Sequence, residues 1–270
     1  MKLKHLPLCA LLLGLAACNE PKSQSNQHNS AVPTDTLTYQ YKTIRERASD
    51  CGNKADTSCT TALIKYPEFD KDAALNDTVA NHLANLFSIT ENAPITSLAD
   101  AAKALVSSYE NNQKKLAAAH IHYALNSRAT IVRQDSTLIS FELSGYEFKG
   151  GAHGISLTKF INWDTRRHRN LQLKDILVDG YEPKLTAIAE KIFRKEELLP
   201  DSASLSRDYF FKGGKFSLNN NFSLTPLGIK FVYNVYEIKP YAAGQTSIEI
   251  PYNQIKKLLR PGTPLAIFLR

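Results

Sequence analysis

The chain has 270 residues, of which 43% are hydrophobic, enough to form one large globular domain or two packed ones. Its formal net charge of +7 comes from cations spread along the chain, which argues against a nucleic-acid-binding stripe. After the first twenty residues no stretch is long and apolar enough to predict a membrane-spanning helix.

The first residues have the parts of an export signal. Lys2 and Lys4 form a positive region, and residues 6–17 form an apolar stretch of about a dozen residues, shorter than the roughly 20 that span a bilayer. The stretch ends in Leu-Ala-Ala followed by Cys18, a pattern typical of a lipobox. We predict a signal peptide over residues 1–17 and lipidation of Cys18. The alternative is an ordinary signal peptide with a chance cysteine.

A lipidated cysteine fixes the cellular location. Each buried methylene of its acyl (palmitate-type) chains contributes about 0.8 kcal/mol, so two or three chains hold a protein on a membrane essentially permanently. Asn19 stands where an aspartate would retain an enteric-type lipoprotein at the inner membrane. We therefore predict a lipid anchor in the cell envelope, at the outer membrane. Residues 18–35, rich in Ser, Asn, Gln and Pro, predict a flexible tether.

Two cysteines remain in the exported body. Cys51 and Cys59 flank a polar loop, and an even pair in an exported chain predicts a disulfide. Closing so small a loop stabilises by roughly 2–3 kcal/mol in the chain-entropy description. A zinc site would need two more ligands, which the loop lacks, and a redox pair normally has the spacing C-x-x-C. We predict a structural cross-link.

Strands and helices are predicted in blocks. Alternating hydrophobicity predicts strands over residues 37–44, 61–66, 117–133, 137–149, 155–163, 169–173, 216–224, 229–233, 247–250 and 265–269. Helical spacing predicts helices over residues 72–87 and 97–112, from Pro183 onward, and near 253–259. Pro67 is expected to end the second strand, and Ser97 to cap the second helix. Blocks without strict alternation predict an α+β fold whose middle strands form an antiparallel meander.

Two strings carry a family resemblance. Residues 146–154 read YEFKGGAHG and residues 236–244 read YEIKPYAAG, and residues 64–69 (IKYPEF) precede a helix. Together they resemble the extracellular domain family of the anti-sigma factor RsiV and the similar accessory domain of the deacetylase PdaC. The resemblance implies antiparallel sheets with packed helices in two closely associated subdomains, PdaC-like over residues 36–170 and RsiV-like over 171–270.

The resemblance implies binding more than catalysis. RsiV senses lysozyme by binding it, but its signalling needs a transmembrane helix and a sigma-binding segment, and the deacetylase needs a metal-binding catalytic domain. The sequence shows none of these, so we expect neither activity. One departure is the turn over residues 164–169, where relatives usually place a glycine and this chain places bulky cations.

His153 is the strongest candidate for catalysis. Gly150, Gly151 and Gly154 surround it, and it would act as a general base if the segment were a catalytic loop. The other interpretation is a bend that needs positive φ or close backbone contact, held by His153. We favour the bend, because no Ser or Cys nucleophile stands in a recognisable setting.

Two further groups of residues are candidates. His120 and His122 lie two apart in a predicted strand, a spacing that suits metal ligation, although polar pairing is the simpler interpretation. Tyr236, Glu237 and Tyr241 form a loop with aromatic surface and one carboxylate, which suits a binding hot spot or, alternatively, packing on the sheet.

We predict an envelope lipoprotein that is held on the membrane by its lipid anchor and binds, without catalysis, a protein such as lysozyme or a cell-wall polymer. No cofactor, metal or nucleic acid is expected. The alternative is a hydrolase or deacetylase that acts on peptidoglycan through His153, with zinc held by His120 and His122.

Overall fold

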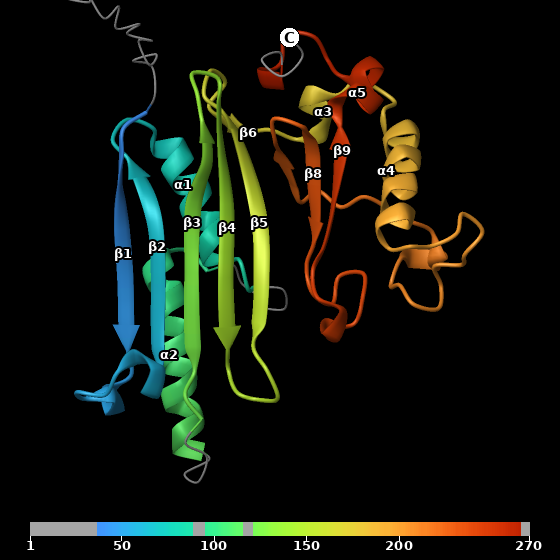
Figure 1. Cartoon of the computed structure of the whole chain (residues 1–270). Helices are drawn as coiled ribbons and strands as arrows, with labels where there is room; N and C mark the ends of the chain where they lie inside the picture. The colour runs from blue at the N-terminus through green and yellow to red at the C-terminus, as the bar shows by residue number, and fades with distance from the viewer. Residues whose placement is uncertain (1–36, 89–94, 116–120, 266–270) are drawn as a thin grey trace, which may run out of the picture. The chain divides into compact units, whose positions relative to one another are not determined.

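The computed structural model describes residues 37–88, 95–115 and 121–265 (Figure 1). The predicted signal peptide, Cys18, the tether and His120 lie outside the described residues. In the described part of the chain, no helix combines the length and hydrophobicity needed to cross a membrane.

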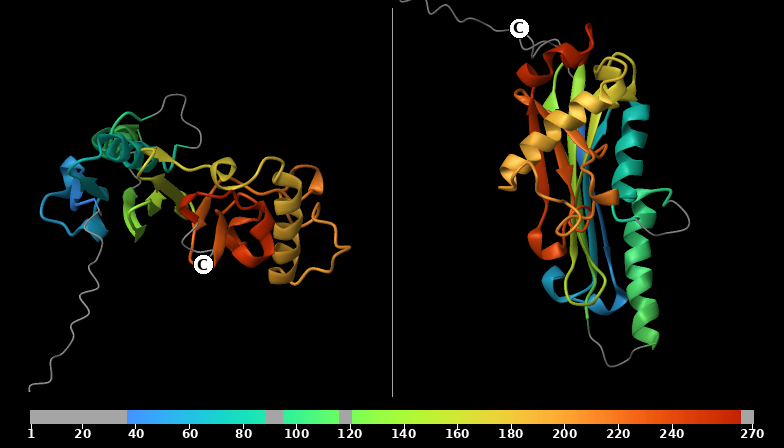
Figure 2. Two further views of the ribbon diagram at one scale, coloured as in Figure 1. Left: turned by 90° about the horizontal axis from the view of Figure 1, so that it is seen from above. Right: turned by 90° about the vertical axis from the view of Figure 1, so that its right-hand side faces the viewer.

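The first half of the body is a six-stranded sheet whose spatial order follows the chain. Its strands are β1 (Tyr39–Arg47), β2 (Thr61–Phe69), β3 (Ala124–Gln134), β4 (Leu138–Phe148), β5 (Ile155–Asp164) and β6 (Arg169–Asn170). All neighbours are antiparallel except β2 and β3, which run parallel. The connection between those two strands contains α1 (Ala73–Ala84) and α2 (Leu98–Lys115). Both helices lie on one face of the sheet (Figure 2).

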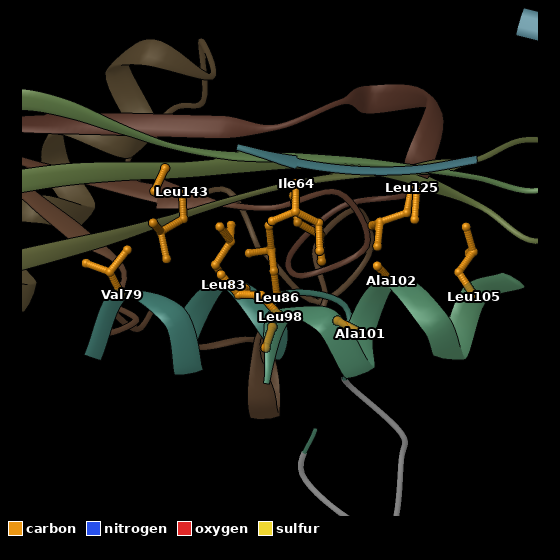
Figure 3. Packing of buried hydrophobic residues seen from close by; sticks show 14 of the residues in the cluster. Ile64, Val79, Leu83, Leu86, Leu98, Ala101, Ala102, Leu105, Leu125 and Leu143 are labelled. Carbon is orange, nitrogen blue, oxygen red and sulfur yellow. The ribbon is translucent and has the colours of Figure 1, made fainter. Parts of the chain in front are cut away.

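The helices pack on the sheet through the apolar stripes that predicted them. Leu75, Val79 and Leu83 recur every four residues along α1, so they share one face, and all three are buried. Ile64 and Leu125 point toward the helices from β2 and β3 (Figure 3). Burying each such side chain contributes about 1.5–3 kcal/mol. This packing forms the first of two buried clusters.

The second half has its own sheet and core. It contains β7 (Phe222–Leu224), β8 (Gly228–Tyr233) and β9 (Thr246–Pro251), all antiparallel. The helices are α3 (Leu173–Ile176), α4 (Glu182–Glu196) and α5 (Tyr252–Ile255). Helix α4 packs against β9, and its buried Phe193 contacts a cluster of aromatic rings. The mixed architecture confirms the predicted α+β class.

Local predictions had mixed outcomes at the element ends. Ser97 caps α2, because its Oγ accepts the backbone N–H of Asp100 at 3.0 Å. The prediction that Pro67 ends β2 was wrong, since the strand continues to Phe69. Pairing of β2 with β3 stops at Lys65, so the missing proline N–H leaves no β3 group without a partner.

Three predicted strands are shorter in the structure. The strand predicted from residue 117 begins at Ala124, and the one predicted over 216–224 is confined to Phe222–Leu224. The strand predicted over 169–173 ends at Asn170, because the residues that follow enter α3. The strand predicted over 265–269 lies almost wholly outside the described residues.

The predicted cysteine pair is well placed. Cys51 and Cys59 are buried, and their Cα atoms are 5.3 Å apart with the sulfur atoms adjacent. This separation lies within the usual range for disulfides. The geometry is compatible with the cross-link, and the oxidised state of the native protein stays a prediction.

Asparagine side chains connect the two sheets along the outer edge of β5. Strand β6 covers only Trp163 and Asp164, so the rest of that edge needs other partners. The Asn234 amide accepts the Thr158 N–H at 2.7 Å and donates to the Thr158 carbonyl at 2.9 Å. Asn221 accepts the Phe160 N–H at 3.0 Å. These amides imitate peptide groups and fix the second sheet against β5.

Candidate binding site

The loop between β4 and β5, residues 149–154, needs its glycines. Gly150 and Gly151 have φ values of +90° and +94°, which L side chains rarely adopt. Gly154 lies against the Tyr146 ring, and a Cβ there would come within 2.4 Å of the ring atoms. The glycines therefore serve the bend and the close contact, as the backbone interpretation of this segment predicts.

The loop between β8 and β9, residues 234–245, is held by Glu237. One carboxylate oxygen of Glu237 accepts the Asn234 N–H at 2.8 Å, and the other accepts the Asn219 amide at 2.7 Å. Tyr236, which lies between Asn234 and Glu237 in the sequence, has φ +67° and is 50% exposed. A non-glycine residue in that region is costly unless its surroundings hold it there. Glu237 thus fixes the turn that presents Tyr236.

The two loops meet in a group of rings that we call the aromatic cluster, formed by His153, Tyr236 and Tyr241, with Tyr146 of β4 nearby against Gly154. The ring of His153 stacks on Tyr241 with centroids 3.7 Å apart and planes at 13°. Tyr236 lies 5.4 Å from Tyr241. The Tyr241 hydroxyl donates to the Gly154 carbonyl at 3.0 Å. The cluster therefore joins loops from both sheets.

Both ring nitrogens of His153 are engaged. Nδ1 lies 3.0 Å from the Gly154 carbonyl, which can only accept, so in the neutral ring Nδ1 carries the proton. Nε2 is then left to accept from the Tyr236 hydroxyl, 3.3 Å away. A general base needs a free nitrogen that faces a reacting group. The arrangement favours a role for His153 in holding the loops together.

A hollow of about 420 Å³ adjoins the aromatic cluster. Its walls include Leu86, Leu157 and Val235, and Tyr236 forms part of its border. Tyr146 is 42% exposed nearby in β4. Exposed rings beside an apolar depression with a few polar groups are typical of ligand-binding surfaces.

Comparisons with known proteins find two segments of the chain that match family models. Residues 53–156 match the family model described as "Deacetylase PdaC", and residues 174–253 match the one described as "Protein of unknown function (DUF3298)". We refer to residues 53–156 as the PdaC-type region and to residues 174–253 as the DUF3298 region, after the models that they match. The PdaC-type region supplies Tyr146 and His153, and the DUF3298 region supplies Tyr236 and Tyr241.

Individual relatives agree with this assignment. The chain is 26% identical over 139 residues to the peptidoglycan-N-acetylmuramic acid deacetylase PdaC of Bacillus subtilis (strain 168), covering 50% of this chain but only 29% of that protein. The crystal structure of a DUF3298 family protein from Pseudomonas aeruginosa PAO1 has a TM-score of 0.63 and 25% identity, covering 83% of this chain and 95% of that one. A DUF3298 family member from Bacteroides fragilis NCTC 9343 has a TM-score of 0.60 and 25% identity, covering 84% and 95%.

The alternative of a zinc site on His120 and His122 is not supported by the described residues. Among the described residues no group of three or more His, Cys, Asp and Glu side chains is arranged to hold a metal ion. His122, in the PdaC-type region, lies beside the Tyr109 ring with centroids 6.4 Å apart. The other candidate, His120, lies outside the described residues.

The cationic turn between β5 and β6 is largely neutralised. Arg167 pairs with Asp164 at 3.2 Å, and Arg169 pairs with Asp175 at 2.7 Å. His168 has φ +48°, so the turn takes the left-handed conformation that glycine adopts most easily. A bulky residue therefore stands at a position where glycine would cost less.

Several residues that build this site were not predicted from the sequence. Tyr146 stands in the quoted string YEFKGGAHG, and its outward position on an alternating strand was the available signal. Asn219 and Asn234 hold the Tyr236 loop, but an asparagine next to a strand predicts only a turn. Leu86 follows α1 and Leu157 lies in β5, and their approach has no local sequence signal.

Proposed function

We propose that the protein is a membrane-anchored envelope lipoprotein that binds a protein or cell-wall ligand through the aromatic cluster, without catalysis. The observation that supports this most is the rigid presentation of exposed tyrosines beside an apolar hollow. Tyrosine supplies a large contact area at low entropic cost, and hot spots are rich in it. A rigid loop also loses little freedom on binding.

Two ligands follow from the relatives. The matched deacetylase acts on peptidoglycan N-acetylmuramic acid, as its name states, which favours a wall-derived glycan. The resemblance to the RsiV domain favours lysozyme. The engagement of both His153 nitrogens favours binding over turnover at this site, so we expect no hydrolysis or deacetylation of peptidoglycan fragments.

The double variant Tyr236→Ala/Tyr241→Ala tests the binding site. Each hot-spot tyrosine contributes about 2 kcal/mol, so the affinity for the captured ligand should fall at least roughly 30-fold. The measurement is capture of lysozyme and of soluble peptidoglycan fragments by the immobilised protein, with urea unfolding to show that the variant folds.

The matched control is Tyr39→Ala/Phe210→Ala, which removes two rings that are 38% and 56% exposed elsewhere. It should bind like the unaltered protein. Equal binding by the cluster variant and the unaltered protein, or no capture of either probe by the unaltered protein, would contradict the proposal.

The anchor has a separate test. Cys18→Ala should move the protein from the membrane fraction to the soluble fraction, because the acyl chains are lost. Mass spectrometry of the native amino-terminal peptide should show cleavage before Cys18 and a diacylglyceryl adduct on its sulfur. Fractionation should place the unaltered protein at the outer membrane. An uncut leader or an unmodified thiol would refute the anchor.

A further inference from the structure

A second hollow, of about 300 Å³, shares Lys159 with the hollow beside the aromatic cluster. We call it the cationic hollow. Its walls come from α1, β5, β6, α3 and β7, and among the described residues that line it none is acidic. Its polar lining residues include His82, Lys159, Asn170 and Lys174.

The cations of this hollow lack neutralising partners within it. Among the described residues, neither Lys159 nor Lys174 forms an ion pair. Asp175 follows Lys174, but its carboxylate accepts the Gln172 N–H at 2.7 Å and pairs with Arg169. A positive hollow without acidic side chains attracts anions.

The ionisation of two lining residues agrees with this. Partial loss of hydration lowers the pKa of the Lys159 ammonium. Burial lowers the pKa of His82, a hydrogen bond to the Thr78 carbonyl opposes that effect, and the nearby Lys159 charge lowers the pKa further. Both groups would be stabilised in their charged forms by an anion between them.

Neutral donors are also available. Asn170 Oδ1 accepts the Asn162 N–H at 3.0 Å, which orients the amide and leaves Nδ2 as a donor. His82 can add a charged donor: its Nδ1 lies 2.9 Å from the Thr78 carbonyl, so Nε2–H becomes free to donate when the ring is protonated. An oxyanion accepts several such hydrogen bonds at once, and charge-assisted ones are strong.

We propose that the cationic hollow binds an oxyanion, a carboxylate or a phosphate group. Because Lys159 lines both hollows, one ligand can place its apolar part beside the aromatic cluster and its anionic group here. That extension rests on the proposed function, whereas oxyanion binding itself does not. The two sources of such a group are a carboxylate-bearing wall sugar and a phosphate-bearing polymer or headgroup.

Chemical-shift titration of the mature chain tests the proposal with three probes: inorganic phosphate, N-acetylmuramic acid, and N-acetylglucosamine, which lacks the carboxylate. We expect saturable shifts at the His82 ring and the amides of residues 170–174 with at least one anion, and none there with N-acetylglucosamine. Lys159→Met should weaken anion binding at least about tenfold, whereas Lys191→Met, on the exposed side of α4, should not. Lys174→Met replaces the first variant if that one fails to fold.

Each outcome of the titration either supports or overturns the proposed oxyanion site. Shifts with phosphate alone assign a phosphate ligand, shifts with N-acetylmuramic acid alone assign a carboxylate, and shifts with both assign a general oxyanion site. No saturable shift, equal shifts with N-acetylglucosamine, or unchanged affinity in Lys159→Met and Lys174→Met would overturn the proposal. Tyr236→Ala/Tyr241→Ala should leave phosphate binding intact, so this site and the aromatic cluster fail or survive separately.

Discussion

Replacing Asn162 by alanine is expected to lower the free energy of unfolding by about 3 kcal/mol, because two buried backbone groups lose their partners. Asn162 is 2% exposed. Its amide donates to the Phe222 carbonyl at 2.8 Å and accepts the Leu224 N–H at 3.2 Å. These bonds connect β5 to β7, so the loss should weaken the junction of the two sheets. Urea unfolding measures the change.

An exposed asparagine, Asn220, provides a matched control for this variant. Asn220 is exposed and its side chain forms no hydrogen bond with the other described residues, so Asn220→Ala should change the free energy of unfolding by less than about 0.5 kcal/mol. A similar small effect for Asn162→Ala would mean that the amide bridges do not hold the sheets together. A large effect for both would point to a general sensitivity of asparagine positions.

Asp72→Ala is expected to have a comparable effect, about 3 kcal/mol, because one carboxylate serves three elements. Its Oδ1 caps α1 by accepting the Leu75 N–H at 3.0 Å. Its Oδ2 accepts the indole N–H of buried Trp163 at 3.2 Å and lies 3.1 Å from His168 Nδ1. Removing it uncaps the helix and leaves the indole without an acceptor.

The isosteric variant Asp72→Asn separates these contributions. Its single amide oxygen can satisfy the helix cap or the indole but not both, so the loss should be roughly half that of Asp72→Ala. Asp77→Ala, exposed on the same helix, is the control and should be nearly neutral. Equal losses of the free energy of unfolding in Asp72→Ala and Asp77→Ala would show that the contacts of Asp72 do not stabilise the fold.

Much of the fold can be predicted from local sequence patterns, because the spacing of apolar residues decides which side chains can be buried in the core. The apolar stripe of α1 and the Ser97 cap of α2 predict helices that the structure contains. The parallel pairing of β2 with β3 could not be predicted, since it depends on how the two helices return the chain. Strand β2 also continues through Pro67, because β3 no longer pairs with β2 at that position and so needs no N–H from it.

Polar residues in strands were the main source of missed structure. Alternation treats Asn162 as a solvent-facing position, yet it is buried between the sheets. The pattern also predicts a solvent-facing position for Asn221, although its amide donates hydrogen bonds to the carbonyls of Thr158 and Val232. Only the second sheet supplies the partners that make these residues structural, and sequence patterns do not show that contact.

The candidate site was predicted as separate residues rather than as one surface. His153 and Tyr236 are separated by 83 positions and came from different strings, and their contact depends on the junction of the sheets. Glu237 was predicted from the sequence as a ligand-facing carboxylate. Its oxygens hold the turn and Asn219, which gives it a positioning role in the structure.

The most direct test of the central claim is hydrogen–deuterium exchange on the protein with and without its captured ligand. Binding at the aromatic cluster predicts slower exchange in residues 149–156 and 234–245, because the ligand would cover both loops. Slower exchange confined to other segments, such as the loop between Cys51 and Cys59, with both aromatic loops unchanged, would contradict it.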